Sequence, residues 1–280
     1  MHHAVPYLLL STVDLLLLLL VWLRTRQPWM FLLLLAFTGM VFMFEYVIMV
    51  LLDSYTYLPR VLPHRPYQDN VIGAIISNLF TIPTLGVLVV MLRLQRPAVF
   101  CIILATCSVE WLFTRLGVYE LHWWRIPYTL AALAFFFYLI RIGVAQLQKG
   151  SRPLAFLMLF LASFALAATM MFVLSVTGTR LFQAGVFADP YHDDVMLATL
   201  DALVKAAVLA GVIYSTRSLL WRGAALPVFW GLQQWLVHTG RLILFLSPPV
   251  YWVLYLLCCL GVLALASLID RKIKYFAGLV

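Results

Sequence analysis

Nine long stretches of apolar residues dominate the sequence and restrict the folds that are open to it. An α-helix needs about 20 apolar residues to cross the ~30 Å hydrocarbon core of a bilayer, where it satisfies its own backbone hydrogen bonds. Apolar residues make up 65% of the 280 residues and charged residues 11%, whereas soluble domains contain about 45–50% and about 25%. These values predict an all-α, polytopic transmembrane helix bundle.

We expect about nine spans within one transmembrane domain that covers residues 1–280. Their expected ranges are 5–23, 29–52, 71–92, 98–118, 127–147, 154–176, 195–214, 224–246 and 249–269. The first range is longer than the apolar core of a signal peptide, which indicates a retained span. Pro83 is expected to bend the third helix. The longest loop, residues 177–194, has the length of a short lid or re-entrant turn.

Basic residues gather on one side of these spans, and cytoplasmic loops of membrane proteins are enriched in Lys and Arg. With the N-terminus outside, the inward-facing segments hold 11 of the 19 basic residues: Arg24, Arg26, Arg93, Arg96, Lys149, Arg152, Arg217, Arg222, Arg271, Lys272 and Lys274. The outward loops hold Arg60, Arg65, Arg125 and Arg180. The pattern predicts an outer N-terminus and a cytoplasmic C-terminus. It also explains the net charge of +8 without a nucleic-acid partner.

Ionisable side chains inside the predicted spans are the strongest functional signal, because such groups are costly in hydrocarbon and are commonly functional. We interpret six of them as candidates to line a central polar cavity: Glu45, Glu110, Asp201, Lys205, His238 and Arg241. Asp201 and Lys205 are four residues apart, so they share a helix face and can neutralise each other. The alternative is that these charges form ion pairs that only fix helix packing.

Four residues in the predicted outward loops form a second candidate group. They are Glu120, His122, His192 and Asp193, which have the side chains needed for acid–base chemistry at the outer leaflet. For His192 and Asp193, the alternative is a solvated loop that caps the next helix. The spacing of histidines and cysteines matches no metal site or disulfide framework, so we expect no metal or cofactor.

A resemblance to known proteins lies in two segments. One runs from Asn78 to Pro83 with the sequence NLFTIP, and the other runs from Glu110 through Gly117 and Tyr119 to Trp123 and Trp124. Over residues 30–145, the chain resembles an uncharacterised group of multi-pass membrane proteins from spore-forming Gram-positive bacteria. The resemblance implies a location in the bacterial cytoplasmic (inner) membrane and no particular activity. Residues 150–280 are additional helices outside it.

A faint internal repetition links the second and fourth spans. Glu45-Tyr46 precedes Arg60 by fifteen residues, and Glu110-Trp111 precedes Arg125 by the same interval. A parallel duplication of two-helix units would produce this pattern, as in transporters. Coincidence is the alternative.

Three functional hypotheses follow. The first is transport or permeation of a polar or charged solute, with proton coupling through Glu45 or Glu110, since a carboxyl group in a low-dielectric interior holds its proton more tightly. The second is an intramembrane enzyme that acts on a lipid-linked substrate. The third is a non-catalytic subunit or assembly factor, whose partners would be the lipid bilayer and another membrane protein.

Overall fold

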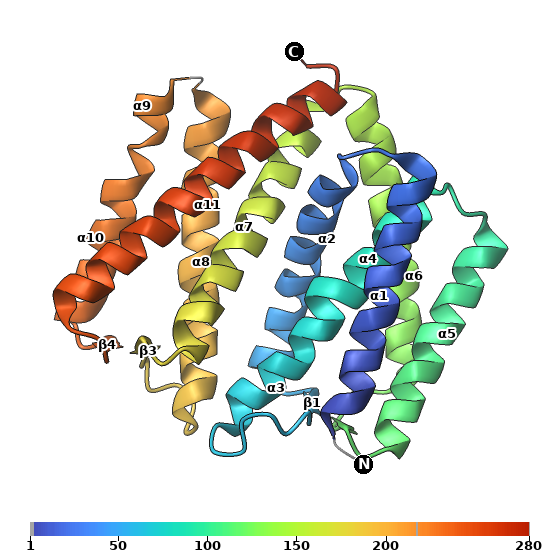
Figure 1. Ribbon diagram of the computed structural model, residues 1–280, viewed down its shortest axis with the longest axis horizontal. Helices are drawn as coiled ribbons and strands as arrows, with labels where there is room; N and C mark the ends of the chain where they lie inside the picture. The colour runs from blue at the N-terminus through green and yellow to red at the C-terminus, as the bar shows by residue number, and fades with distance from the viewer. Residues whose placement is uncertain (1–2, 217, 280) are drawn as a thin grey trace. The chain divides into compact units, whose positions relative to one another are not determined.

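The computed structural model describes residues 3–216 and 218–279. Arg217, expected on the inner side, lies outside the described residues. The chain forms two compact units, unit 1 (Met1–Ser151) and unit 2 (Arg152–Val280). In Figure 1, unit 1 runs from blue to green and unit 2 from yellow-green to red.

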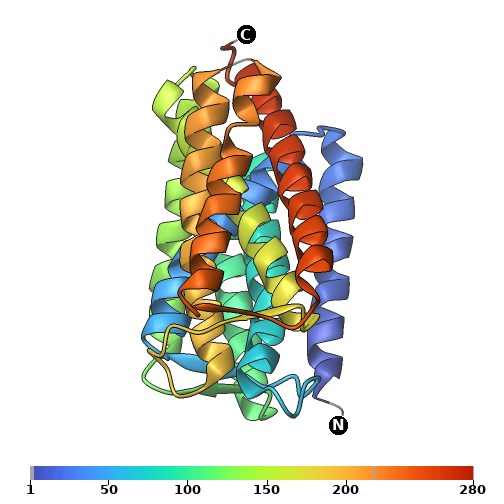
Figure 2. The same ribbon diagram turned by 90° about the vertical axis from the view of Figure 1, so that its left-hand side faces the viewer.

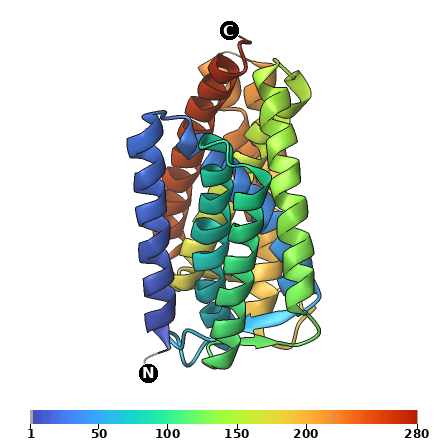
Figure 3. The same ribbon diagram turned by 90° about the vertical axis from the view of Figure 1, so that its right-hand side faces the viewer.

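Unit 1 consists of long helices and two short strands. Its elements are α1 (Ala4–Thr25), α2 (Met30–Glu45), the π-helix η1 (Tyr46–Leu51), β1 (Tyr55–Tyr57), α3 (Pro66–Ile75), the π-helix η2 (Ile76–Thr81), α4 (Ile82–Met91), α5 (Arg96–Arg115), β2 (Tyr119–Leu121) and α6 (Ile126–Gln148). The segments α3, η2 and α4 follow one another directly, so the third helix changes to π geometry at Ile76 and returns to α geometry at Ile82, just before Pro83. The helix α1 packs against η2 and α4, and α5 packs against α6 (Figure 3).

Unit 2 has a similar content. Its elements are α7 (Arg152–Val176), β3 (Arg180–Phe182), α8 (Pro190–Ser215), α9 (Leu219–Arg222), α10 (Ala225–His238), β4 (Leu242–Leu244) and α11 (Pro248–Phe276). The helix α7 packs against α8 and α11, and α10 packs against α11. The loops around β3 and β4 lie at the end of unit 2 opposite to the C-terminus (Figure 2).

The helical spans confirm the predicted helical membrane architecture, with one difference. Among the described residues, eight helical segments are long and apolar enough to cross a membrane. The range 224–246 is not a single helix, because α10 has 14 residues and ends at His238. Gly240 then adopts a left-handed conformation with a φ of 69°, and a strand follows. His238 is therefore the last residue of α10, and Arg241 lies beyond the helix, directly before β4.

The four short strands were not predicted. Each begins two residues after a residue with positive φ, namely Asp53, Gly117, Gly178 and Gly240. A left-handed residue ends a helix efficiently, and the next residues are then free to extend. The strands pair antiparallel, β1 with β2 and β3 with β4. This pairing satisfies the backbone N–H and C=O groups of the residues that follow the helix ends.

The two units repeat one topology. After α1, unit 1 has the order helix, strand, helix, helix, strand, helix, and unit 2 has the same order with the short α9 added. The hydrogen bonds that flank the strand pairs correspond: Leu58 N–H to Val118 O (2.9 Å) matches Gln183 N–H to Arg241 O (2.8 Å), and His122 N–H to Ser54 O (3.0 Å) matches Phe245 N–H to Thr179 O (3.1 Å). The repeat is therefore larger than the one suggested between spans two and four.

Each unit also folds the loop after its first strand around two residues at the start of the next helix. The sequences there are PYQDN (66–70) and PYHDD (190–194). Asp69 accepts hydrogen bonds from three successive backbone N–H groups of its loop, and Asp193 accepts from four. The following residue holds the strand, since Asn70 accepts from Tyr57 N–H at 2.8 Å and Asp194 accepts from Phe182 N–H at 2.7 Å.

Candidate functional site

Unit 1 encloses a cavity of about 260 Å³ between α1, α2, η2, α5, α6 and the paired strands. Most of its lining is apolar or aromatic, and its acidic residues are Glu45 and Glu110. No Lys, Arg or His from the described part of the chain lines it. Of the six residues expected to line one central polar cavity, Glu45 and Glu110 line this one.

Glu45 is held at the point where α2 changes to π-helix geometry. Glu45 as a whole is only 9% exposed. The Tyr55 hydroxyl donates a hydrogen bond of 2.7 Å to its Oε1, and the Asn78 side chain is a second polar neighbour. The other carboxyl oxygen, Oε2, is buried without a hydrogen-bond partner among the described residues.

Glu110 lies on α5 and contributes a second buried carboxyl group. The Thr129 hydroxyl interacts with it, and the same hydroxyl accepts a hydrogen bond of 2.8 Å from Trp124 Nε1. Neither carboxyl oxygen of Glu110 has a partner of ordinary hydrogen-bond geometry within the described residues. The two glutamates also interact electrostatically with each other. The cavity therefore holds several acceptor oxygens that lack both a hydrogen bond and an opposite charge.

Aromatic rings from the strand pair form the end of the cavity. The ring centroids of Tyr57 and Tyr119 are 4.8 Å apart, and those of Tyr55 and Tyr119 are 5.3 Å apart. Trp124 stands 5.9 Å from Tyr55, and all four rings line the cavity. Burial raises the pKa of the three tyrosine phenols well above the ordinary value, so these rings stay neutral hydrogen-bonding groups.

Unit 2 places its interior charges differently, because they pair with each other. Lys205 forms an ion pair with Asp201, and the two side chains are 1% and 2% exposed. The Lys205 ammonium lies 5.0 Å from the centre of the Tyr255 ring. The amide of Gln233 lies 3.5 Å from Asp201 Oδ2. The predicted Asp201–Lys205 ion pair is thus present, and both of its side chains are buried.

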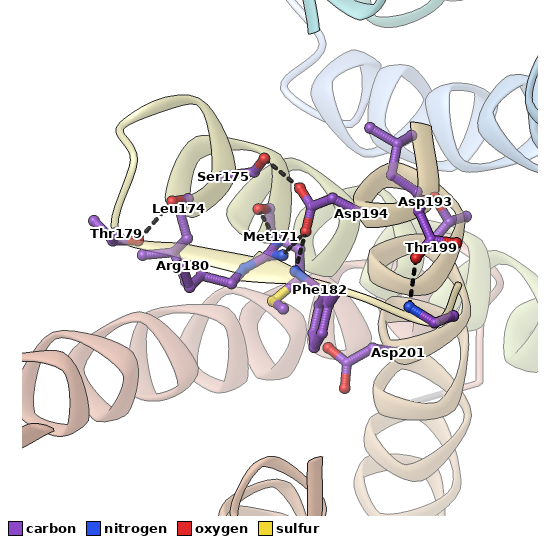
Figure 4. A network of polar contacts seen from close by, with 12 residues as sticks. Met171, Leu174, Ser175, Thr179, Arg180, Phe182, Asp193, Asp194, Thr199 and Asp201 are labelled. Carbon is purple, nitrogen blue, oxygen red and sulfur yellow. Dashed lines mark hydrogen bonds and ion pairs between the residues drawn. The ribbon is translucent and has the colours of Figure 1, made fainter. Parts of the chain in front are cut away.

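A second buried ion pair joins Arg180 to Asp194 (Figure 4). Both side chains are fully buried, although Arg180 was expected in an outward loop. Asp194 also accepts a hydrogen bond from the Ser175 hydroxyl, and Arg180 donates to the Met171 carbonyl. The guanidinium lies 4.2 Å from the centre of the Phe182 ring. These contacts join α7, β3 and α8.

The remaining candidates lie outside these interiors. His238 and Arg241 are exposed, and Arg241 donates to the Ala184 carbonyl. Glu120 is an exposed residue of β2 opposite Thr56. His122 lies 2.8 Å from the Asp53 carbonyl oxygen. Of these groups, His122 and Arg241 hold neighbouring loop backbone within their own units.

His192 and Asp193 lie in the first turn of α8, directly after the loop that follows β3. The His192 ring stacks on Phe187 with centroids 3.6 Å apart, and Asp193 anchors the loop as described. The helix cap itself is Asp189, which accepts from the N–H groups of Tyr191 and His192. Across residues 3–216 and 218–279, no three His, Cys, Asp or Glu side chains are grouped so that they could hold a metal ion.

Eight long apolar helical segments place the chain among multi-pass α-helical membrane proteins. Comparisons with protein-family models, with curated proteins and with solved structures found no match.

Proposed function

We propose that the protein transports a positively charged solute and that the cavity of unit 1 is its binding site. The observation that carries the proposal is that three buried carboxyl oxygens of this cavity, Oε2 of Glu45 and both of Glu110, have no partner of ordinary hydrogen-bond geometry and no lining cation in the described residues. Asp201 Oδ1 in unit 2 also lacks a hydrogen bond, but its carboxylate is paired with Lys205. Buried charge without compensation is costly, and ionisable residues in membranes commonly mark solute paths. A cation supplies the missing partner.

The orientation forms part of the proposal. In unit 1, the N-terminal helix begins beside the strand pair, since Tyr7 donates to the Val118 carbonyl. We place this end outside and the ends rich in Arg and Lys in the cytoplasm of a bacterial cell. Because β3 pairs with β4, the start of α8 and the end of α10 lie at one end of unit 2. The chain between them returns across the unit, which supports nine crossings.

The enzyme hypothesis has less support. Its candidate groups Glu120 and His122 lie in unit 1, and His192 and Asp193 lie in unit 2. Asp193 is occupied by four backbone donors of its own loop, which leaves it poorly suited to exchange protons with a substrate. Buried ion pairs such as those of unit 2 fit a packing role.

The test uses the full chain reconstituted in liposomes on a solid-supported membrane. Ammonium, guanidinium, choline and phenyltrimethylammonium are applied in turn, and the charge displaced across the membrane is recorded. We expect a protein-dependent current with at least one of them, abolished by Glu110→Gln. The matched control is Glu120→Gln, an exposed carboxylate changed in the same way, which should keep the current. Absence of a current with all four, or full activity of Glu110→Gln, would refute the proposal.

A further inference from the structure

The interior of unit 2 holds a cation of its own at the place that corresponds to the cavity of unit 1. The Lys205 ammonium contacts the Asp201 carboxylate, the face of Tyr255 and the sulfur of Met171. Gln233 completes this group through its contact with Asp201. The repeated topology allows each of these positions to be matched to unit 1.

We match positions in the two units by counting residues from the paired strands and from the two aspartates that hold the loops, Asp69 and Asp193. Gln233 stands eight residues before Arg241, as Glu110 stands eight before Val118. Tyr255 stands eleven residues after the end of β4 and seven after the start of α11. Because the loop before α6 is one residue longer, Ala132 matches it when counted from the end of β2 and Leu133 when counted from the start of α6. These two counts put Glu110 where unit 2 has Gln233, and Ala132 or Leu133 where unit 2 has Tyr255. All three residues of unit 1 line the cavity.

The third helix of the repeat gives the same result. Asp201 and Lys205 stand eight and twelve residues after Asp193. Ser77 and Thr81 stand eight and twelve after Asp69, and both line the cavity.

The cavity therefore has a simple physical origin. Unit 2 fills its interior with the long side chains of Lys205 and Tyr255. Unit 1 has shorter side chains there, Thr81 in place of Lys205 and Ala132 or Leu133 in place of Tyr255. The Thr81 hydroxyl turns to Asp14 on α1, to which it donates a hydrogen bond of 2.6 Å. Unit 1 thus keeps a carboxyl-rich, aromatic interior and lacks the attached ammonium group that neutralises unit 2.

From this correspondence we infer that the cavity of unit 1 takes an organic cation with an aromatic-sized apolar body, such as a protonated or quaternary aromatic amine. The inference rests on the proposed function, since it names the class of solute for the same site. The carboxyl groups compensate the charge, and neutral tyrosine and tryptophan faces attract a desolvated cation. The predominantly apolar lining accommodates the body.

The size of the space agrees with a ligand of this class. A dry cavity of about 150 Å³ binds one benzene molecule, so the cavity of about 260 Å³ has room for a ring with a charged substituent. An inorganic ion would leave most of the apolar lining without contacts, which is unfavourable.

The lining also reaches the outer surface of the helices. Phe44 on α2 and Phe135 on α6 line the cavity, and they are 41% and 61% exposed. In a membrane, such surfaces face hydrocarbon. A cation with an apolar body is soluble enough in the interfacial region of the bilayer to reach the cavity laterally, whereas a strongly hydrated ion is not.

The experiment measures binding to the full chain in nanodiscs by quenching of Tyr and Trp fluorescence, with protein-free nanodiscs as the blank. The probes are phenyltrimethylammonium, its uncharged analogue of the same shape tert-butylbenzene, and tetramethylammonium, which lacks the ring. We expect phenyltrimethylammonium to bind at least about tenfold more tightly than either of the others, because only it has both the charge and the ring. Glu110→Gln should remove this preference for charge, and Glu120→Gln should keep it.

Glu110→Gln has a built-in check on folding. The amide has the size of Gln233 in unit 2, and a folded variant still binds tert-butylbenzene as the parent does. Equal affinity for the charged and uncharged probes, or tight binding of phenyltrimethylammonium by this variant, would overturn the inference. So would tetramethylammonium binding as tightly as phenyltrimethylammonium.

The outcomes separate the inference from transport. Charge-selective binding of phenyltrimethylammonium without any solute-driven current would refute the transport proposal and support the inference. A current with ammonium or guanidinium that depends on Glu110, in a protein that does not bind phenyltrimethylammonium, would overturn the inference and support transport.

Discussion

Units 1 and 2 share a framework and differ in how they treat buried charge. Both have the same order of long helices and strands, the same strand pairing and the same pair of loop anchors. Inside unit 2, the carboxylates of Asp194 and Asp201 each have a cationic partner. Inside unit 1, Glu45 and Glu110 surround a cavity that has none. The framework at the strand end therefore does not depend on what fills the interior.

Removing the fully buried carboxylate of unit 2 should have the largest effect on stability. Asp194→Ala leaves the Arg180 guanidinium, the Ser175 hydroxyl and the Phe182 N–H without their shared acceptor. Loss of one partner of a buried ion pair costs about 3–5 kcal/mol. The matched change in unit 1, Asn70→Ala, removes an uncharged acceptor of one N–H and should cost about 1–3 kcal/mol.

Unfolding of the purified variants in mixed micelles, followed by circular dichroism, gives the two free energies. A smaller loss for Asp194→Ala than for Asn70→Ala would show that the ion pair contributes no more than a neutral strand anchor. The buried ion pairs of unit 2 would then not distinguish it energetically from unit 1.

The same chemical change at two corresponding sites should have opposite signs. Asp201→Asn leaves Lys205 as a buried cation without its ion-pair partner and should destabilise the protein by about 3 kcal/mol. Glu110→Gln removes a buried, uncompensated carboxyl group, and it should stabilise the protein without ligand by about 1 kcal/mol. This gain reflects the usual conflict between a functional site and stability.

The measurement is again the free energy of unfolding in mixed micelles, without added amines. Glu120→Gln serves as the control for a change from carboxylate to amide on the surface, and it should leave the stability unchanged. Destabilisation by Glu110→Gln as large as that by Asp201→Asn would mean that Glu110 already has a partner in the protein.

The sequence predicts the helices well because their signal is local. A run of about 20 apolar residues defines a span by itself, and the i, i+4 spacing is enough to pair Asp201 with Lys205. Glu45 and Glu110 are both visible as charges within spans. Their common cavity is not visible, since it depends on how separate helices pack.

The strands and the repeat were missed for a different reason. Three-residue strands are shorter than any periodic pattern can detect. The signals that were present are Gly117 and Gly240 just after apolar helices, and the related segments PYQDN and PYHDD. The predicted span 224–246 is longer than α10 because Leu242, Ile243 and Leu244 are as apolar as a membrane span. These three residues form a strand after the left-handed Gly240.

Adding the missing ammonium group to unit 1 should make it resemble unit 2. Ala132→Lys places an amine among residues that line the cavity, within one residue of the position that corresponds to Tyr255 in the repeat. We expect an internal ion pair with Glu110 and loss of phenyltrimethylammonium binding by at least about tenfold, since the attached amine takes the place of the ligand charge. Ala132→Met, of similar length and uncharged, is the control for occupied volume.

The two variants distinguish charge from space. Ala132→Met should weaken phenyltrimethylammonium and tert-butylbenzene to the same extent, whereas Ala132→Lys should weaken the charged probe more. Equal effects of Ala132→Lys on both probes would indicate that the lysine side chain only fills the cavity. The matched positions in the two units would then be equivalent in space, but the lysine in unit 1 would not replace the charge of the ligand.

The smallest effects are expected at His122 and His192, which lie near the strand pairs. His122 contacts the Asp53 carbonyl in unit 1, and His192 stacks on Phe187 in unit 2. Either change to alanine should cost at most about 1 kcal/mol of stability, with the solute-driven current of the liposomes unchanged. Loss of that current in His122→Ala, in a variant that unfolds like the parent, would assign the outer face a part in the activity. The paired strands and their loops would then take part in the activity. The functional difference between the two units would lie in these loops as well as in the interiors.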